Sequence, residues 1–269
     1  MKHLILTVFS AVLVIAAFGQ KKEGKVTYER TTQMQIRFTD SERGDLENML
    51  PKSRTDRFEL LFGNNQSLWK QLEDEVQEEM ASGGGGGFQF RMIAAGADDV
   101  SFYNFDASQR IDQRELGTKK YIVEDSVRRL NWKLTDETKS ILGYNCRKAI
   151  AQRVGKRTMM TMENGKMERK ETSDTSTIIA WYSSEFAVTA GPGEFQGQLP
   201  GLVLEVDVNN GRQVIKATEV SSKVDVASIK APKGGKKVSS AEFEKERDKM
   251  FEEMQKNNGG PGRTIRISQ

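Results

Sequence analysis

The amino-acid sequence predicts an α+β protein that is predominantly antiparallel β: a curved sheet or half-barrel with one internal amphipathic helix and a C-terminal helix. Two observations favour this fold class. Many short segments rich in β-branched and aromatic residues alternate apolar with polar side chains, and tight-turn signals separate them. Only two segments repeat their apolar residues at helical spacing. Many short strands with close turns and few helices indicate antiparallel pairing.

The strands follow one another along most of the chain, and turn residues mark their ends. The run Gly63-Asn64-Asn65 ends the second strand, and 209–211 joins the last two. The segment 146–162 is interpreted as a hairpin with its turn at Gly155, and Asn164-Gly165 is a further tight-turn signal. The expected strands are 25–37 (one strand or a pair), 57–62, 100–105, 121–123, 130–134, 147–153, 157–162, 177–182, 202–208 and 213–220.

The first half of the chain also contains a loop, the internal helix and an insertion. Polar residues over 39–52 predict a loop that holds a short helical turn. Between 66 and 80 the apolar residues recur every fourth position, which predicts the amphipathic helix. The glycine-rich segment 82–87 predicts a flexible insertion, because the Lys-Ser/Thr pair of a phosphate-binding Walker loop does not follow it.

The C-terminal segment differs in composition from the rest. Residues 233–237 are expected to form a linker, and Ser239 with Glu242 is typical of a helical capping box. Phe243, Met250, Phe251 and Met254 then fall on one face of the predicted C-terminal helix. The sequence therefore predicts a signal peptide at 1–19, a β-rich domain at 20–235, and a linker, amphipathic helix and flexible tail at 236–269.

The first nineteen residues are expected to form a cleavable secretory signal. Basic Lys2 precedes an apolar run over 4–18, and the small residues Ala17 and Gly19 predict cleavage before Gln20. A membrane anchor, the alternative, needs about 20 apolar residues, and the polar segment begins sooner. The protein is therefore expected to be exported, either periplasmic or outer-membrane-associated, with no transmembrane helix after signal cleavage.

Composition excludes several chemistries. Cys146 is the single cysteine, so it forms no internal disulfide and supplies no lipid anchor near the signal. Burial is its expected fate, and a bond to a second chain is the alternative. His3 is the only histidine and leaves with the signal, which excludes histidine-based catalytic sets and metal ligands. No catalytic residue, metal site or cofactor is assigned, and 41 basic against 38 acidic residues do not indicate a nucleic-acid partner.

Two stretches carry a distinctive pattern. The first has Trp-Lys-Leu-Thr at 132–135 and Ile-Leu-Gly-Tyr-Asn-Cys-Arg-Lys-Ala at 141–149. The second has Ala-Trp-Tyr at 180–182, Gly-Pro-Gly-Glu-Phe at 191–195 and Leu-Pro-Gly-Leu-Val-Leu-Glu-Val at 199–206. In this order and spacing they resemble the GLPGLI family of exported bacterial envelope proteins.

The resemblance extends from about residue 102 to 232 and implies location more than mechanism. Family members look like periplasmic or outer-membrane-associated proteins with no established biochemical activity, and some accompany outer-membrane transport components. The resemblance thus implies an outer-membrane protein, or a lipid or peptide ligand, as the partner. This chain departs from the name motif, because Gln198 precedes Leu-Pro-Gly and Val203 replaces isoleucine.

The motif has a structural and a functional interpretation. Pro200 fixes φ and Gly201 can take positive φ, which predicts a tight turn feeding an apolar strand, while Trp132, Trp181 and Tyr182 would anchor the sheet. Alternatively, a rigid loop near Trp181 recognises a hydrophobic or peptide partner. The candidate recognition or turn residues are Trp181, Tyr182, Gly191, Pro192, Leu199, Pro200, Gly201 and Leu202.

Three functions compete on this sequence. The leading hypothesis is a non-enzymatic envelope binding or accessory protein, serving outer-membrane transport, whose curved sheet presents an apolar concave face. The second is a structural envelope component. The third is an enzyme that uses carboxylates, but neighbouring acids such as Asp98 and Asp99 would point to opposite faces of a strand.

Overall fold

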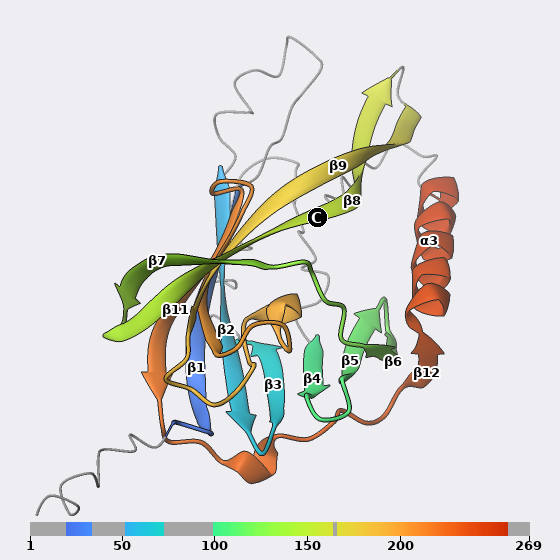
Figure 1. Ribbon diagram of the computed structural model, residues 1–269. Helices are drawn as coiled ribbons and strands as arrows, with labels where there is room; N and C mark the ends of the chain where they lie inside the picture. Colours follow the sequence, from blue (N-terminus) through green and yellow to red (C-terminus); the bar gives the residue numbers. More distant parts are fainter. Residues whose placement is uncertain (1–19, 34–51, 73–98, 164–165, 258–269) are drawn as a thin grey trace, which may run out of the picture.

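The computed structural model describes residues 20–33, 52–72, 99–163 and 166–257 (Figure 1). The described residues form one open twelve-stranded sheet and a C-terminal helix, α3 (Ser240–Asn257). The strands are β1 (Gly24–Gln33), β2 (Ser53–Gly63), β3 (Gln66–Gln71), β4 (Val100–Asn104), β5 (Gln109–Leu116), β6 (Lys119–Ser126), β7 (Lys133–Ile141), β8 (Tyr144–Glu163), β9 (Lys166–Ser183), β10 (Leu202–Val208), β11 (Gln213–Ser221) and β12 (Lys236–Ser239).

The strand pairing confirms the predicted fold class. The order across the sheet is β12-β6-β5-β4-β3-β2-β1-β11-β10-β9-β8-β7, and β12 and β6 are the parallel pair among otherwise antiparallel neighbours. No helix in the described ranges is long and apolar enough to cross a membrane. The signal peptide, the insertion 82–87, the tail after residue 257 and all but the last residue of the loop 39–52 are predictions that lie outside the described residues.

The sheet curves around the connection between β9 and β10, residues 184–201, which lies inside the curve (Figure 1). Two hydrogen bonds show how far this connection reaches. The Tyr103 hydroxyl of β4 donates to the Gly193 carbonyl at 3.2 Å, and the Ser67 hydroxyl of β3 donates to Gln196 Oε1 at 2.5 Å. Because β11, β1, β2 and β3 separate β10 from β4, the connection spans the inner side of the half-barrel.

The main core lies between the inner face of the sheet and this connection. Apolar side chains of β1, β2, β9, β10 and β11 pack against Phe186, Val188, Phe195 and Leu199 of the connection. Tyr28 is fully buried there, and its hydroxyl donates to the Val203 carbonyl at 2.6 Å. The connection is therefore part of the hydrophobic core and covers the concave face over these strands.

The predicted helix over 66–80 is wrong for residues 66–71, which form β3. Asn64 and Asn65 have φ values of 50° and 55°, so the expected stop signal is a hairpin turn that returns the chain beside β2. Trp69 then stacks on Phe58 with ring centroids 4.8 Å apart. Residues 66–71 pair with β2 on one side and with β4 on the other. This pairing stabilises a strand more than the apolar residue at every fourth position favours a helix. Residues 73–80 lie outside the described part.

Three other sequence predictions need correction. The expected hairpin at 146–162 is wrong, because β8 is continuous and Gly155 pairs with Asp174 within its ladder. The strand expected at 130–134 is β7, which begins only at Lys133. In addition, the sequence did not predict β5, because the residues on the inner face of this strand are polar. Of the predicted linker, Lys236 and Lys237 belong to β12.

The C-terminal helix begins where the sequence predicts. The Ser239 backbone N–H donates to Glu242 Oε2 at 2.7 Å, and the Glu242 N–H donates to Ser239 Oγ at 3.3 Å, which confirms the capping box. Phe243 packs edge-on against Tyr121 of β6, with ring centroids 5.4 Å apart. The helix therefore packs at the β6–β12 edge of the sheet.

Candidate functional site

The candidate motif residues separate into buried positions and a few at the surface. Tyr182 is buried, whereas Trp181 is half-buried on the neighbouring position of β9. The Lys139 ammonium lies 4.4 Å from the Trp181 ring centroid and forms a 2.6 Å ion pair with Glu205. The Trp181 ring on β9 is therefore in contact with the Lys139 ammonium group. Gly191, Pro192, Leu199, Gly201 and Leu202 are buried, and Pro200 is exposed.

The Leu-Pro-Gly-Leu sequence forms the expected tight turn. The Gly201 N–H donates to the Leu199 carbonyl at 2.9 Å, and the turn leads directly into β10. Gly201 has φ of 152°, and a Cβ atom placed on it would lie 2.2 Å from the Ser183 carbonyl oxygen. Only glycine permits this approach of two backbone segments. Gly201 therefore fixes how the connection meets β9.

Gln198 links the connection to the segment between β6 and β7. Its Oε1 accepts hydrogen bonds from the Leu130 N–H and from Trp132 Nε1, each at 3.0 Å. Its Nε2 donates to the Glu194 carbonyl at 2.7 Å. Gln198, one of the two departures from the GLPGLI name motif, thus joins 127–132 to the loop inside the sheet.

The Gln198→Ala variant is expected to lower the free energy of unfolding by about 1–3 kcal/mol, because the Trp132 indole and two backbone groups lose their partners. Urea unfolding measures the loss, and the Trp132 indole proton resonance should move. Gln198→Glu keeps the acceptor oxygen and removes the donor, so its loss should be smaller. Equal stability of Gln198→Ala and the parent would contradict this role.

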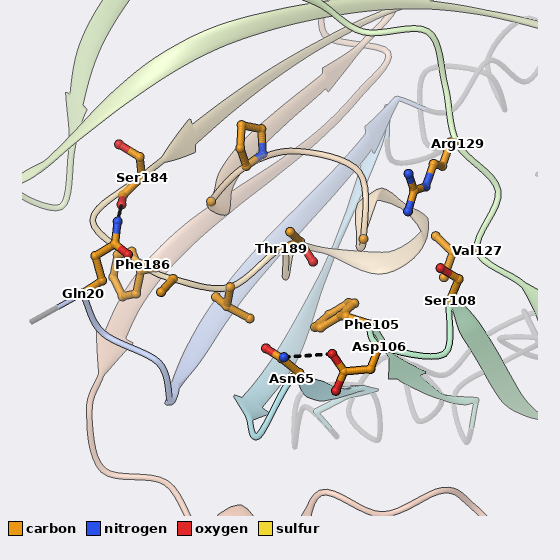
Figure 2. Close-up of a pocket in the computed structure, with 15 residues that line it drawn as sticks. Gln20, Asn65, Phe105, Asp106, Ser108, Val127, Arg129, Ser184, Phe186 and Thr189 are labelled. Atoms are coloured by element: carbon orange, nitrogen blue, oxygen red, sulfur yellow. Dashed lines mark hydrogen bonds between the residues drawn. The ribbon is translucent and has the colours of Figure 1, made fainter.

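A hollow of about 430 Å³ lies where the connection meets three other loops and the N-terminal residue of the described chain (Figure 2). Its wall comes from Gln20, the β2–β3 turn at Asn65, the β4–β5 turn at 105–108, the segment 127–129 and the connection 184–201. Its volume is within the range of small-ligand sites, about 300–1,000 Å³. Segments far apart in the sequence therefore create one concave surface.

Backbone hydrogen bonds hold this wall together. The Phe105 N–H donates to the Asn65 carbonyl at 2.9 Å, and the Val127 N–H donates to the Ser108 carbonyl at 2.9 Å. Gly197 has φ of 72°, and its N–H donates to the Thr189 carbonyl at 2.6 Å. A Cβ atom on Gly197 would lie 3.0 Å from the Val127 side chain. The positions of the wall segments therefore depend on the register of the strands and on the conformation of Gly197.

The polar groups of the hollow carry one positive and one negative charge. Asn65 Nδ2 donates to Asp106 Oδ1 at 2.9 Å, and Gln20 Nε2 donates to the Ser184 carbonyl at 3.1 Å (Figure 2). Arg129 is exposed and has no ion-pair partner among the described residues. Phe105 supplies an aromatic side chain beside these groups. The surface can accept and donate hydrogen bonds. Arg129 can pair with a negative group of a ligand, and Asp106 can pair with a positive one.

Sequence reasoning found little of this hollow. Of the candidate residues, Pro200 and Gly201 line it, whereas Trp181 and Tyr182 do not. Asn65, Asp106 and Arg129 were missed because each lies in a loop with no distinctive motif. The Asn64-Asn65 and Leu-Pro-Gly turn signals mark parts of the wall, and each indicates a turn without indicating a ligand.

Neither a cluster of metal-ligating side chains nor a reactive cysteine is found among the described residues. No group of three or more Cys, Asp, Glu or His side chains that could hold a metal ion occurs among them. Cys146 is a free thiol and is fully buried, as expected, and burial raises its pKa to about 11. A buried thiol with a raised pKa is a poor nucleophile near neutral pH. Asp99 bonds to Arg114 at 2.5 Å, and Asp98 lies outside the described part.

Comparison with known proteins gives a family match over part of the chain. A family described as "Protein of unknown function (Porph_ging)" matches residues 132–205, which include the segment 132–149 and the Leu-Pro-Gly turn. No curated protein matches the chain. The match covers the first distinctive stretch and all but the last residue of the second, so the chain is similar to a family of unknown function in the region that includes the loop inside the sheet.

A solved structure of PNGF-II shares the fold. The chain aligns with PNGF-II in space group C2 at a TM-score of 0.50 and 18% identity, over 85% of this chain and 33% of that chain. For the P21 crystal form the TM-score is 0.49 at 18% identity, over 83% of this chain and 32% of that chain. The chain thus spans about a third of the length of PNGF-II, and the likeness shows the β-sheet fold.

Proposed function

We propose that this chain is a non-enzymatic accessory protein of the cell envelope that binds a short polar peptide segment of an outer-membrane partner in the hollow. The observation that carries the proposal is the hollow itself, a concave surface of about 430 Å³ built by five chain segments. The resemblance to GLPGLI proteins and the sequence of residues 1–19 support export to the periplasm or the outer membrane.

The chemistry of the hollow favours a peptide over a lipid. A peptide backbone carries both donors and acceptors, and it can meet the Asn65 amide, the Asp106 carboxylate and the Arg129 guanidinium together. A lipid chain would need a continuous apolar surface. The apolar concave face expected for that purpose is covered by the chain's own residues 184–201 over β1, β2, β9 and β10. This covering of the concave face favours the hollow as the proposed binding surface.

The fold of PNGF-II supports a modular role. In PNGF-II a sheet of this kind makes up about a third of the chain. A domain that is one part of a larger protein in one case can serve a separate partner in another. This chain would then act by binding a partner, in keeping with an accessory protein.

The Arg129→Glu variant tests the proposal. The parent protein, purified from its native membranes after crosslinking, is expected to retain a partner whose contact segment is then made as a synthetic peptide. Arg129→Glu should weaken binding of that peptide about tenfold in calorimetry, since it reverses an unpaired charge in the wall.

Arg128→Glu is the matched control for this experiment. Arg128 is the sequence neighbour of Arg129, but its guanidinium pairs with Asp125 at 3.2 Å and it does not line the hollow. The Arg128→Glu substitution should leave peptide affinity within about twofold of the parent value, because the exposed ion pair that it breaks contributes little. Equal weakening by both variants, or no retained partner at all, would refute a binding role for the hollow.

A further inference from the structure

Two arginines and one aspartate form a separate cluster at the opposite end of β2 from the hollow. The hollow lies beside Asn65, just after β2 ends, whereas Arg54 and Asp56 lie near its start. Arg30 of β1 is directly opposite Asp56 in the ladder. By alternation along the strands, Arg30 and Asp56 share a face with the core residues Tyr28 and Phe58. The cluster therefore continues the inner face beyond the hydrophobic core.

A buried carboxylate orients both guanidinium groups. The Asp56 side chain is fully buried, and its two oxygens accept from Arg54 Nε at 2.7 Å and from Arg30 Nη2 at 3.0 Å. The Arg30 guanidinium also lies 4.4 Å from the Phe58 ring centroid, and Phe58 stacks on Trp69. An arginine fixed by a carboxylate and an aromatic ring loses little freedom on binding a ligand. The pair is therefore preorganised.

The cluster has more donors and more positive charge than its own acceptor satisfies. Two guanidinium groups share one carboxylate, and the inner-face neighbours Thr32, Ile215 and Gln213 carry no charge. Arg30 Nε is buried and has no acceptor among the described residues. A buried donor without a partner is rare in folded proteins and calls for an acceptor. Arg30 Nη1 and both Nη atoms of Arg54 donate to no acceptor among the described residues, so their N–H groups are available to an oxyanion.

We infer that Arg30 and Arg54 form a binding site for an oxyanion, a phosphate or carboxylate group, distinct from the hollow. Planar guanidinium forks match the geometry of these groups and bind them through paired N–H donors. Asp56 serves as the positioning residue that holds the forks, and it does not contact the ligand. The inference is independent of the peptide-binding proposal, because no residue of the cluster lines the hollow.

Titration with inorganic phosphate at constant low ionic strength tests the site. The chain has three tryptophans, and Trp69 reaches the cluster through Phe58, so its indole proton should shift saturably while those of Trp132 and Trp181 stay unchanged. Arg54→Gln should weaken phosphate binding about tenfold, because one charge-assisted fork is lost. Chloride at equal ionic strength should give no saturable shift.

Two further variants keep the result interpretable. Arg212→Gln removes an arginine that pairs with Asp174 at 3.6 Å outside the cluster, and it should bind phosphate like the parent. Arg54→Lys keeps a positive partner for Asp56 but lacks the planar guanidinium. It replaces Arg54→Gln in the phosphate titration if Arg54→Gln does not fold. Absence of a saturable Trp69 shift, or equal affinity of the parent and both Arg54 variants, would overturn the site.

Vesicles distinguish the source of the oxyanion. Phosphatidylglycerol vesicles that compete with inorganic phosphate for the Trp69 signal, when phosphatidylcholine vesicles do not, identify an anionic lipid headgroup as the ligand. Failure of both to compete, with phosphate still bound through Arg54, identifies a soluble phosphate or carboxylate compound. Either result supports the oxyanion site, and the phosphate titration alone decides whether it exists.

Discussion

The Gly201→Ala variant is expected to lose about 3–5 kcal/mol of unfolding free energy, the largest effect predicted for a single methyl group in this protein. The added Cβ would lie 2.2 Å from the Ser183 carbonyl oxygen and 2.7 Å from its carbon. Both are backbone atoms of Ser183, the last residue of β9. The clash can therefore be relieved only if the end of β9 and the turn move apart. Usual overpacking costs about 1–3 kcal/mol, because side chains can adjust.

Gly155→Ala provides the control for this prediction. Gly155 lies within β8, and a Cβ atom placed on it meets nothing within 4 Å. Its substitution should leave stability unchanged or raise it slightly, since alanine restricts the unfolded chain. Chemical denaturation followed by tryptophan fluorescence compares the two variants. A Gly201→Ala protein as stable as Gly155→Ala would show that the connection does not approach β9 as described.

The Leu199→Ala variant is expected to cost about 2–5 kcal/mol, the range for large-to-small substitutions in a packed core. Leu199 is 2% exposed and belongs to the main cluster, although it lies in a loop. This result separates the two interpretations of the Leu-Pro-Gly motif. A recognition loop that only awaits a partner would tolerate the loss of a leucine side chain, whereas a loop within the core would not.

Leu134→Ala is the matched control, since it removes the same atoms from a side chain that is 46% exposed. Its stability should stay within about 1 kcal/mol of the parent, because less apolar surface is returned to water. Both variants are compared by thermal and urea unfolding. Similar losses for Leu199→Ala and Leu134→Ala would place the connection outside the core and favour the recognition interpretation.

The strands that the sequence predicts correctly are those whose local signals agree with their surroundings. β10 begins with buried residues, alternates buried and partly buried residues from Leu204 to Val208, and is followed by Asn209-Asn210-Gly211, where both asparagines have φ near 50°. The capping box at Ser239 is equally local. In such segments the turn residue, the side-chain period and the burial all favour one structure, so no tertiary information is needed.

The errors occur where distant strands decide the outcome. Leu68 and Leu72 fit a helical repeat, yet β2 and β4 pair with Gln66–Gln71 on both sides. Gly155 resembles a turn residue, but β9 continues the ladder past it. β5 places Arg110 and Asp112 on the inner face, where they pair with each other, so its pattern is not that of a half-apolar strand. Sequence periodicity contains no information on such partners.

The candidate site was even less accessible to sequence reasoning. The Leu-Pro-Gly segment was identified correctly as a tight turn, since proline and glycine act locally. The hollow, in contrast, depends on strand register, which brings Asn65, Asp106 and Arg129 together from three loops. The Arg30 and Arg54 pair depends on the β1–β2 alignment in the same way. Both assemblies arise from strand pairing between distant segments, which local sequence patterns do not encode.

Amide hydrogen exchange tests most directly whether the β9–β10 connection is a fixed part of the core. The Gly197 N–H donates to the Thr189 carbonyl at 2.6 Å, and the Phe195 N–H donates to the Pro192 carbonyl at 3.1 Å. We expect both amides to exchange as slowly as the amides of β10, in the same cooperative unit. Rapid exchange of these two amides while β10 stays protected would contradict a core connection, and with it the fixed wall on which the hollow depends.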